Sequence, residues 1–237
     1  MNGEGYGARY CGRVTDPGIF DRFKTVQDRM AAAAARAHRS LPDIRLIAVT
    51  KVFPATAIRD GYELGLRDFG ENYVQEFEGK APQVAELEGA RFHLIGHLQG
   101  NKSKRAAELF QVIQTVDSAK LARRLGEAGR TLEVMIEVKL SEEEAKSGAD
   151  PAETAAIVEA CRAAPNLRLL GLMTVPPWSE DAEFSRPYFA RLREMGERHG
   201  LRELSMGMSN DLEVAIEEGA TMVRVGTALF GKRKKQA

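Results

Sequence analysis

The sequence predicts an α/β fold built on a parallel sheet, because strand-length apolar runs alternate along the chain with amphipathic helical patterns. There are eight strand candidates, seven helical patterns between them and one further helical pattern in front. This count favours a single TIM-type (β/α)8 barrel with an extra N-terminal helix, although roughly 23 residues per unit is lean for such a barrel. A doubly wound open sheet is the alternative. No G-x-G-x-x-G motif follows the first strand, so a dinucleotide-binding fold has no local support.

The chain begins with a glycine-rich segment that has little apolar periodicity, and we predict a flexible tail over residues 1–18. From Phe20 onward, apolar residues repeat at helical spacing, and the alanine run at 31–35 is a strong helix former. A helix is therefore predicted over 20–37. The short apolar stretch at 44–49 has the length of a strand and is predicted to be the first one.

The remaining elements follow in regular alternation. Further strands are predicted at 67–70, 92–95, 112–116, 132–138, 167–172, 204–206 and 221–225. Helices are predicted at 56–65, 73–87, 102–109, 118–129, 151–163, 184–199 and 211–218. No internal repeat or linker-like stretch divides the chain, so we predict one domain over 19–231, followed by a basic tail over 232–237.

Composition excludes several classes of function. The 34 lysines and arginines balance 34 aspartates and glutamates, whereas nucleic-acid and membrane-surface binders need an excess of positive charge. No apolar run approaches the ~20 residues of a membrane helix, and the first residues lack the apolar stretch of a secretory signal. Two cysteines cannot by themselves form a disulfide framework or a zinc site. We therefore expect a cytoplasmic protein, monomeric or homodimeric, with no nucleic-acid or membrane partner.

The carboxyl ends of parallel strands are where working residues gather, and Lys51 follows the first strand at such an end. A lysine rising from a packed sheet is partly desolvated, which lowers its pKa and frees its amine to attack a carbonyl. A solvated lysine at a strand end is the alternative interpretation.

A second candidate is the segment 207–211, between a weak strand and a helix. Ser209 or Asn210 suits a helix N-cap, and Glu213 follows Asn210 at the spacing of a capping box. The functional alternative is that exposed N–H groups and the Ser209 hydroxyl bind a phosphate.

A third candidate is the segment Arg224–Thr227 after the last strand, which in a closed barrel lies beside the strand that carries Lys51. Gly226 permits close backbone approach, Thr227 adds a hydroxyl, and the loops around strands seven and eight form the usual phosphate site of such barrels. An amine, two phosphate-binding elements and the Arg224 guanidinium would then meet at one mouth. That combination suits pyridoxal phosphate, whose aldehyde needs a lysine and whose ring nitrogen needs a polar partner.

The same residues carry a resemblance to a known family. Seven stretches in consistent order resemble the pyridoxal 5′-phosphate homeostasis protein family, over roughly residues 20–231. They are Ala-Val-Thr-Lys at 48–51, Phe-Gly-Glu-Asn-Tyr-Val-Gln-Glu at 69–76, His-Leu-Ile-Gly-His-Leu-Gln-Gly-Asn-Lys at 93–102, Lys-Ser-Gly at 146–148, Gly-Leu-Met at 171–173, and the runs 204–211 and 221–231.

The resemblance implies an alanine-racemase-like barrel that holds pyridoxal 5′-phosphate as an aldimine. Lys51 matches the family's Schiff-base lysine, Arg224 matches the arginine that faces the pyridine nitrogen, and Asn72 matches a residue lining the pocket. The positions that match its phosphate-binding residues are Ser209, Gly226 and Thr227.

Two functions are compatible with these residues. The first is a carrier without catalysis that buffers pyridoxal phosphate inside the cell and has apo-enzymes dependent on that cofactor as partners. The second is an amino-acid racemase of the alanine-racemase type, which needs two acid–base groups on opposite faces of its substrate. Lys51 could be one; no tyrosine has the context of the other, and little sequence follows Arg224 for the additional β-domain of those racemases. We favour the carrier.

No metal site is predicted. His93 and His97 stand four residues apart, but they flank a strand end instead of sharing a helix face, and no third ligand is evident.

Overall fold

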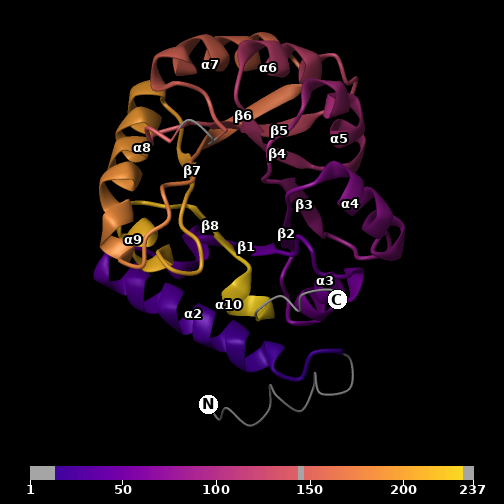
Figure 1. Cartoon of the computed structure of the whole chain (residues 1–237), viewed down its shortest axis with the longest axis vertical. Coiled ribbons are helices and arrows are strands. Elements are labelled where there is room, and N and C mark those ends of the chain that lie inside the picture. The colour runs from indigo at the N-terminus through magenta and orange to yellow at the C-terminus, as the bar shows by residue number, and fades with distance from the viewer. Residues whose placement is uncertain (1–13, 144–146, 232–237) are drawn as a thin grey trace.

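Eight parallel strands close into a barrel in which each strand pairs with the next along the chain (Figure 1). The structure is a computed structural model that describes residues 14–143 and 147–231. The strands are β1 (Arg45–Val49), β2 (Asp68–Glu71), β3 (Arg91–Leu94), β4 (Val112–Val116), β5 (Leu132–Glu137), β6 (Leu167–Met173), β7 (Glu203–Ser205) and β8 (Met222–Val225). The predicted barrel is confirmed, and the open-sheet alternative is wrong.

The barrel closes where β8 pairs with β1. Ile47 lies opposite Arg224 in this pairing, and Ala48 lies opposite Val225. The first and last strands therefore place Lys51 and Arg224 at neighbouring positions on the carboxyl-end edge of the barrel, as the sequence predicted.

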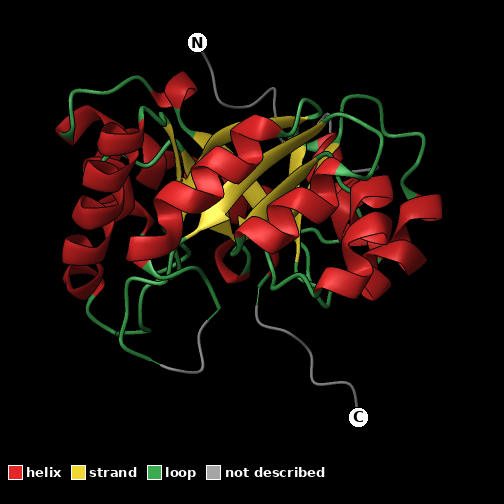
Figure 2. Ribbon diagram, turned by 90° about the horizontal axis from the view of Figure 1, so that it is seen from above, coloured by secondary structure: helices red, strands yellow, loops and turns green. Residues whose placement is uncertain are grey.

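Helices surround the barrel, as the side view also shows (Figure 2). They are α2 (Ile19–Arg36), α3 (Ala55–Glu63), α4 (Val74–Lys80), α5 (Ser103–Leu109), α6 (Ala119–Gly126), α7 (Thr154–Ala163), α8 (Arg186–His199), α9 (Leu212–Glu217) and α10 (Thr227–Phe230). Short 3₁₀ turns are η1 (Leu41–Asp43), η2 (Ala81–Gln83), η3 (Gly100–Lys102), η4 (Pro151–Glu153) and η5 (Ala182–Ser185).

The leading helix α2 packs outside the last units of the barrel, against α9 and α10 (Figure 1). Its buried residues recur at helical spacing and are Ile19, Val26, Met30, Ala33 and Ala34. Arg22 Nε donates to the Leu229 carbonyl at 2.7 Å, and Arg29 forms two hydrogen bonds to Glu213 at 2.6 and 2.7 Å. The extra helix therefore supports the elements that border the mouth of the barrel.

Three features differ from expectation or lie outside it. The helix predicted over 73–87 ends at Lys80 and continues as η2, which has proline at its start, because proline cannot donate the hydrogen bond that an α-helix requires. Helix α10 has only four residues and was not predicted. Of the two predicted tails, residues 1–13 and 232–237 lie outside the described residues, and so does Lys146. Thr15 belongs to the described part of the first predicted tail, and it donates two hydrogen bonds of 2.7 Å to Asp60.

The hydrophobic core has two parts. The larger lies between the sheet and its helices, and a small cluster of Ile47, Met135 and Met222 lies in the barrel interior. In the part of the chain that the structure describes, no helix has the length and apolarity needed to span a membrane.

Candidate functional site

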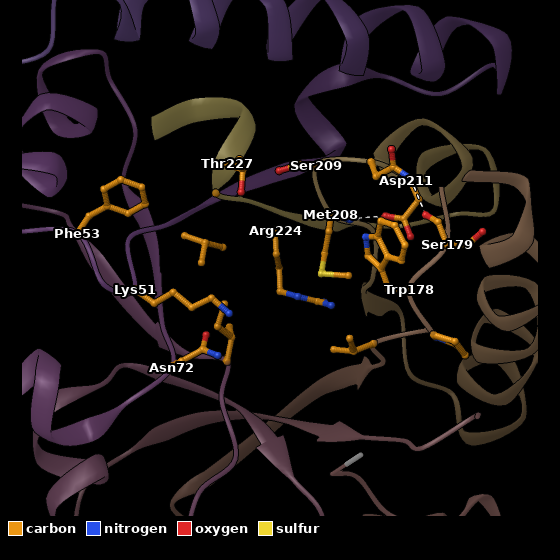
Figure 3. A pocket seen from close by; sticks show the side chains of 16 residues that line it. Lys51, Phe53, Asn72, Trp178, Ser179, Met208, Ser209, Asp211, Arg224 and Thr227 are labelled. Carbon is orange, nitrogen blue, oxygen red and sulfur yellow. Dashed lines mark hydrogen bonds between the residues drawn. The ribbon is translucent and has the colours of Figure 1, made fainter. Parts of the chain in front are cut away.

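A cavity of about 350 Å³ opens at the carboxyl ends of the strands (Figure 3). All six residues predicted for the site line it. They are Lys51, Asn72, Ser209, Arg224, Gly226 and Thr227. Figure 3 shows Lys51 and Asn72 on one side, Ser209 and Thr227 on the opposite side, and Arg224 between them. The cavity is within the usual size range of small-molecule sites.

Lys51 lies in a tight turn between β1 and α3. Thr50 N donates to the Gly70 carbonyl at 2.9 Å, and Phe53 N donates back to the Thr50 carbonyl at 3.1 Å. Val52 has a left-handed φ of 59°, which is rare for a β-branched residue and occurs where the surrounding structure enforces it. The turn directs the Lys51 side chain into the cavity (Figure 3).

A buried ion pair holds this turn in place. Lys80 Nζ, on α4, lies 2.9 Å from Glu71 Oε1 at the end of β2 and donates to the Thr50 carbonyl at 2.9 Å. It also lies 2.6 Å from Glu76, whose carboxylate accepts a hydrogen bond of 2.5 Å from Val52 N. Burial raises the pKa of Glu71, and the neighbouring Lys80 opposes that rise. The cluster thus fixes the residues on both sides of Lys51.

The side chain of Asn72 contains an unsatisfied hydrogen-bond acceptor among the described residues. Its Oδ1 atom is buried and has no hydrogen-bond partner among the described residues, a situation that is uncommon in native proteins and marks the atom as available to a ligand. The backbone of Asn72 passes very close to Gly96, since a Cβ atom on residue 96 would lie 2.2 Å from the Asn72 carbonyl oxygen. Glycine at position 96 therefore permits this position of Asn72.

Arg224 carries a buried positive charge on the wall of the cavity. Its side chain is enclosed, and its two Nη atoms donate to Ser205 Oγ at 2.7 Å and to the Thr174 carbonyl at 2.8 Å. Burial lowers the pKa of Arg224 to about 10, a drop opposed by the charges of Glu137 and Asp211. The guanidinium therefore remains charged at neutral pH.

The opposite side of the cavity presents backbone N–H groups and hydroxyls. Ser209 Oγ accepts a hydrogen bond from Ala228 N at 3.3 Å, which links the loop after β7 to the start of α10. Helix α10 begins at Thr227 directly after Gly226, and its next N–H groups are already bonded, that of Ala228 to Ser209 and those of Leu229 and Phe230 to the Gly226 carbonyl. A Cβ atom on Gly226 would lie 3.3 Å from the Val49 carbonyl oxygen, so the chain passes close to β1 here.

The predicted helix cap in this segment is wrong. Helix α9 is preceded by Asp211 as N-cap residue, without a side-chain cap bond. Glu213 is bound to Arg29 and does not complete a capping box, because α2 brings that arginine to it. Ser209 therefore contributes to the cavity instead of capping α9.

Several other polar residues lie nearby that the sequence interpretation missed. Glu137, at the end of β5, is buried with an unpartnered Oε2 among the described residues, and burial raises its pKa to about 7. The ion pair of Glu71 and Lys80 was also missed. Glu71 directly precedes Asn72 in the sequence, and Lys80 follows Glu71 by nine residues. Only the fold shows that these two side chains meet.

The residues set aside earlier do not form a metal centre. His93 is buried in the barrel interior and bonded to Asp68, whereas His97 is half exposed and lies 3.4 Å from Asp117. Within residues 14–143 and 147–231, no group of three or more histidine, cysteine, aspartate or glutamate side chains could hold a metal ion.

Comparisons with known proteins show which family this chain resembles. A family model described as the N-terminal domain of alanine racemase matches residues 26–234. The pyridoxal phosphate homeostasis protein of Pseudomonas aeruginosa is 46% identical over 221 residues, which cover 91% of this chain and 96% of that protein.

Two solved structures extend the comparison. A protein of unknown function from Bifidobacterium adolescentis matches with a TM-score of 0.83 and 37% identity, covering 93% of this chain and 99% of that one. The PipY protein of Synechococcus elongatus, solved with pyridoxal phosphate bound, matches with a TM-score of 0.74 and 39% identity, covering 87% of this chain and 100% of that one.

Proposed function

The chain belongs to the alanine racemase N-terminal domain family and, within it, to the pyridoxal phosphate homeostasis proteins, and from this premise we propose that it binds pyridoxal phosphate through Lys51 and acts as an intracellular carrier of that cofactor. The observation that carries the proposal is that one cavity is lined by Lys51, Asn72 and Arg224 and also by the two hydroxyl residues Ser209 and Thr227. Each of these groups has a counterpart on the ligand.

The residues fit pyridoxal phosphate in chemical type and in arrangement. The hydroxyls of Thr227 and Ser209 suit a phosphate, because each can donate a hydrogen bond to the dianion. Arg224 can donate only, so it suits the lone pair of the ring nitrogen. The orphan acceptor of Asn72 suits a donor group on the ring, and it lies beside Lys51 (Figure 3).

Lys51 would provide the covalent anchor. Its amine adds to the aldehyde carbon, a C=N bond replaces the C=O bond, and one molecule of water leaves. The linkage is reversible by the same water, so the protein can hold the aldehyde and release it again. When bound, the cofactor would supply an electron sink for carbanions, but a carrier needs only capture and release of the aldehyde.

A racemase is the second candidate, since the matching family model is named after alanine racemase. Racemisation requires two acid–base groups on opposite faces of the substrate. Besides Lys51, the described cavity wall contains one carboxylate, Asp211, whose oxygens accept from Met208 N at 2.7 Å and from Ser185 Oγ at 2.8 Å. Neither tyrosine nor histidine lines the described cavity. These contacts support the carrier.

The test is to follow the fate of the bound cofactor. The protein is loaded with pyridoxal phosphate and mixed with the apo form of an aminotransferase that depends on it. We expect the aminotransferase to regain activity while the loaded protein loses its bound-cofactor absorbance. Failure of the loaded protein to give up its cofactor would contradict the carrier.

A parallel incubation distinguishes the racemase. The loaded protein is kept with L-alanine in deuterated water, with Lys51→Ala as the matched control. We expect no exchange of the α-proton at an enzymatic rate. Exchange in the unmodified protein that disappears in Lys51→Ala would establish the racemase instead.

A further inference from the structure

A continuous chain of side-chain hydrogen bonds crosses the barrel interior from the cavity to the start of β2. Arg224 Nη1 lies 2.7 Å from Ser205 Oγ, which lies 2.6 Å from Gln114 Oε1. Gln114 Nε2 lies 3.0 Å from His93 Nδ1, and His93 Nε2 lies 2.8 Å from Asp68 Oδ1. The five side chains come from β8, β7, β4, β3 and β2, so the chain depends on the whole barrel being closed.

The hydrogen bonds of this chain all run in one direction. A guanidinium can only donate and a carboxylate can only accept, so Arg224 and Asp68 fix the two ends. Ser205 accepts from Arg224 and donates to the Gln114 carbonyl oxygen, and the Gln114 amide donates to His93. Burial lowers the pKa of His93, which keeps the imidazole neutral with its one proton on Nε2, toward Asp68.

The middle of the chain is closed to bulk solvent. The exposed fraction of His93, Gln114 and Ser205 is 0% in each case. In such surroundings successive hydrogen bonds reinforce one another, and a buried donor or acceptor that loses its partner cannot turn to water instead. Each member therefore constrains the next.

Arg224 is where this constraint reaches the cavity. Its Nη1 is held by Ser205 and its Nη2 by the Thr174 carbonyl, while the side chain lines the cavity wall (Figure 3). These two hydrogen bonds fix the plane of the guanidinium, whereas an arginine without them could rotate freely. The orientation of the guanidinium is thus set by two residues that do not line the cavity.

We infer that Gln114 and His93 are positioning residues that, through Ser205, orient Arg224 toward the ring nitrogen of the bound cofactor; this inference depends on the proposed function. Neither residue lines the cavity. Their effect should therefore be confined to the one ligand atom that Arg224 faces, which separates it from a general contribution to the fold.

The test compares two aldehydes that differ only at that atom. The first is pyridoxal phosphate, and the second is 1-deazapyridoxal phosphate, in which a CH group replaces the ring nitrogen. Dissociation constants for both are measured on the unmodified protein and on Gln114→Met, which keeps the side-chain length but removes the hydrogen bonds to Ser205 and His93. Met135→Leu is the matched control, since Met135 is equally buried in the barrel interior but lies outside the chain.

We expect Gln114→Met to weaken binding of pyridoxal phosphate about threefold to tenfold, the range given by the smaller coupling energies within one network. Binding of the deaza compound should be unchanged, and Met135→Leu should alter neither. Ser205→Ala breaks the same chain with a smaller change in volume and should give the same selective loss if Gln114→Met folds poorly.

Equal weakening of both aldehydes in Gln114→Met and Ser205→Ala, or no change in either, would overturn the inference. A failure of the unmodified protein to bind either aldehyde is a different result, because it would contradict the proposed function itself.

Discussion

Lys80 Nζ lies 2.9 Å from Glu71 Oε1 and so joins α4 to the end of β2, directly beneath the turn that carries Lys51. The exposed fraction of Lys80 is 7% and that of Glu71 is 0%, so neither charge has access to bulk water. Such a pair adds little stability by itself, but removing one partner leaves an uncompensated buried charge.

Lys80→Met should therefore destabilise the protein by about 3–5 kcal/mol. The loss should be larger at pH 8 than at pH 5. Burial already raises the pKa of Glu71, so the folded state takes up a proton more readily than the unfolded state, and stability falls as pH rises between the two pKa values. Lys80 lowers the pKa of Glu71, so without it the fall should extend to higher pH and be larger. Urea unfolding at pH 5 and pH 8 measures it.

Lys80→Met combined with Glu71→Gln is the control, because it removes both charges. The double variant should recover most of the lost stability and lose the added fall in stability at high pH. If the double variant is as unstable as Lys80→Met, the effect comes from packing and not from the unpaired carboxylate.

Gly96→Ala should weaken cofactor binding by displacing Asn72. The added Cβ atom would meet the Asn72 carbonyl oxygen at 2.2 Å and its Cα atom at 2.8 Å, and backbone atoms cannot move aside as a flexible side chain can. Overpacking of this kind costs about 1–3 kcal/mol. Melting temperature and titration with pyridoxal phosphate measure the two effects.

Gly79→Ala is the matched glycine control. A Cβ atom there meets nothing within 4 Å, and Gly79 lies inside α4. Alanine in a helix interior should stabilise the protein by about 1 kcal/mol or less and leave binding unchanged. Unaltered binding in Gly96→Ala would refute the role assigned to the close approach.

Glu137→Gln should change how stability depends on pH. Burial raises the pKa of Glu137 from 4.5 to about 7, which Asp117 reinforces and Arg224 opposes. Between these two values the folded state holds a proton that the unfolded state has lost, so stability decreases by up to about 3 kcal/mol as pH rises through that window. Glutamine cannot ionise, so the variant should lack this slope.

Unfolding by urea at pH 5, 6 and 8 checks this prediction. The difference in stability between Glu137→Gln and the unmodified protein should shift in favour of the variant as pH rises from 5 to 8. Parallel curves for the two proteins would show that Glu137 does not titrate in this range.

Ser209→Ala and Thr227→Ala should weaken pyridoxal phosphate binding by about 10- to 150-fold each, because each removes a hydrogen bond to a charged phosphate. The two effects need not add, since both act on one group. Trp178 is the single tryptophan and lines the cavity, so quenching of its fluorescence provides the binding signal.

Pyridoxal without its phosphate is the control for these variants. It keeps the aldehyde for Lys51 and the ring nitrogen for Arg224, so its affinity should barely change. Equal weakening of both ligands would mean that Ser209 and Thr227 act through the fold.

The barrel and most of its elements could be predicted from alternation alone, because apolar runs and helical patterns record which faces are buried. The end of α4 was placed too late because the helical pattern continues past Lys80, although the proline in η2 is a sequence signal for that end. Helix α10 has four residues, too few for any periodicity to appear.

For the site, the rule that parallel strands present functional residues at their carboxyl ends identified Lys51 and Arg224. Asn72 came only from the family resemblance. The hydrogen-bond chain behind Arg224 was not predictable, because Gln114 and His93 lie within strands whose other residues are mostly apolar. Only the register of the closed barrel brings them into line behind Arg224.

Borohydride reduction of the protein loaded with pyridoxal phosphate, followed by peptide mapping, tests the central claim most directly. Reduction converts a C=N bond to lysine into a stable C–N bond and so marks the lysine that carried it. The account predicts a single pyridoxyl group on the peptide containing Lys51 and none there in Lys51→Ala. A label on another lysine, with Lys51 unmodified, would contradict it.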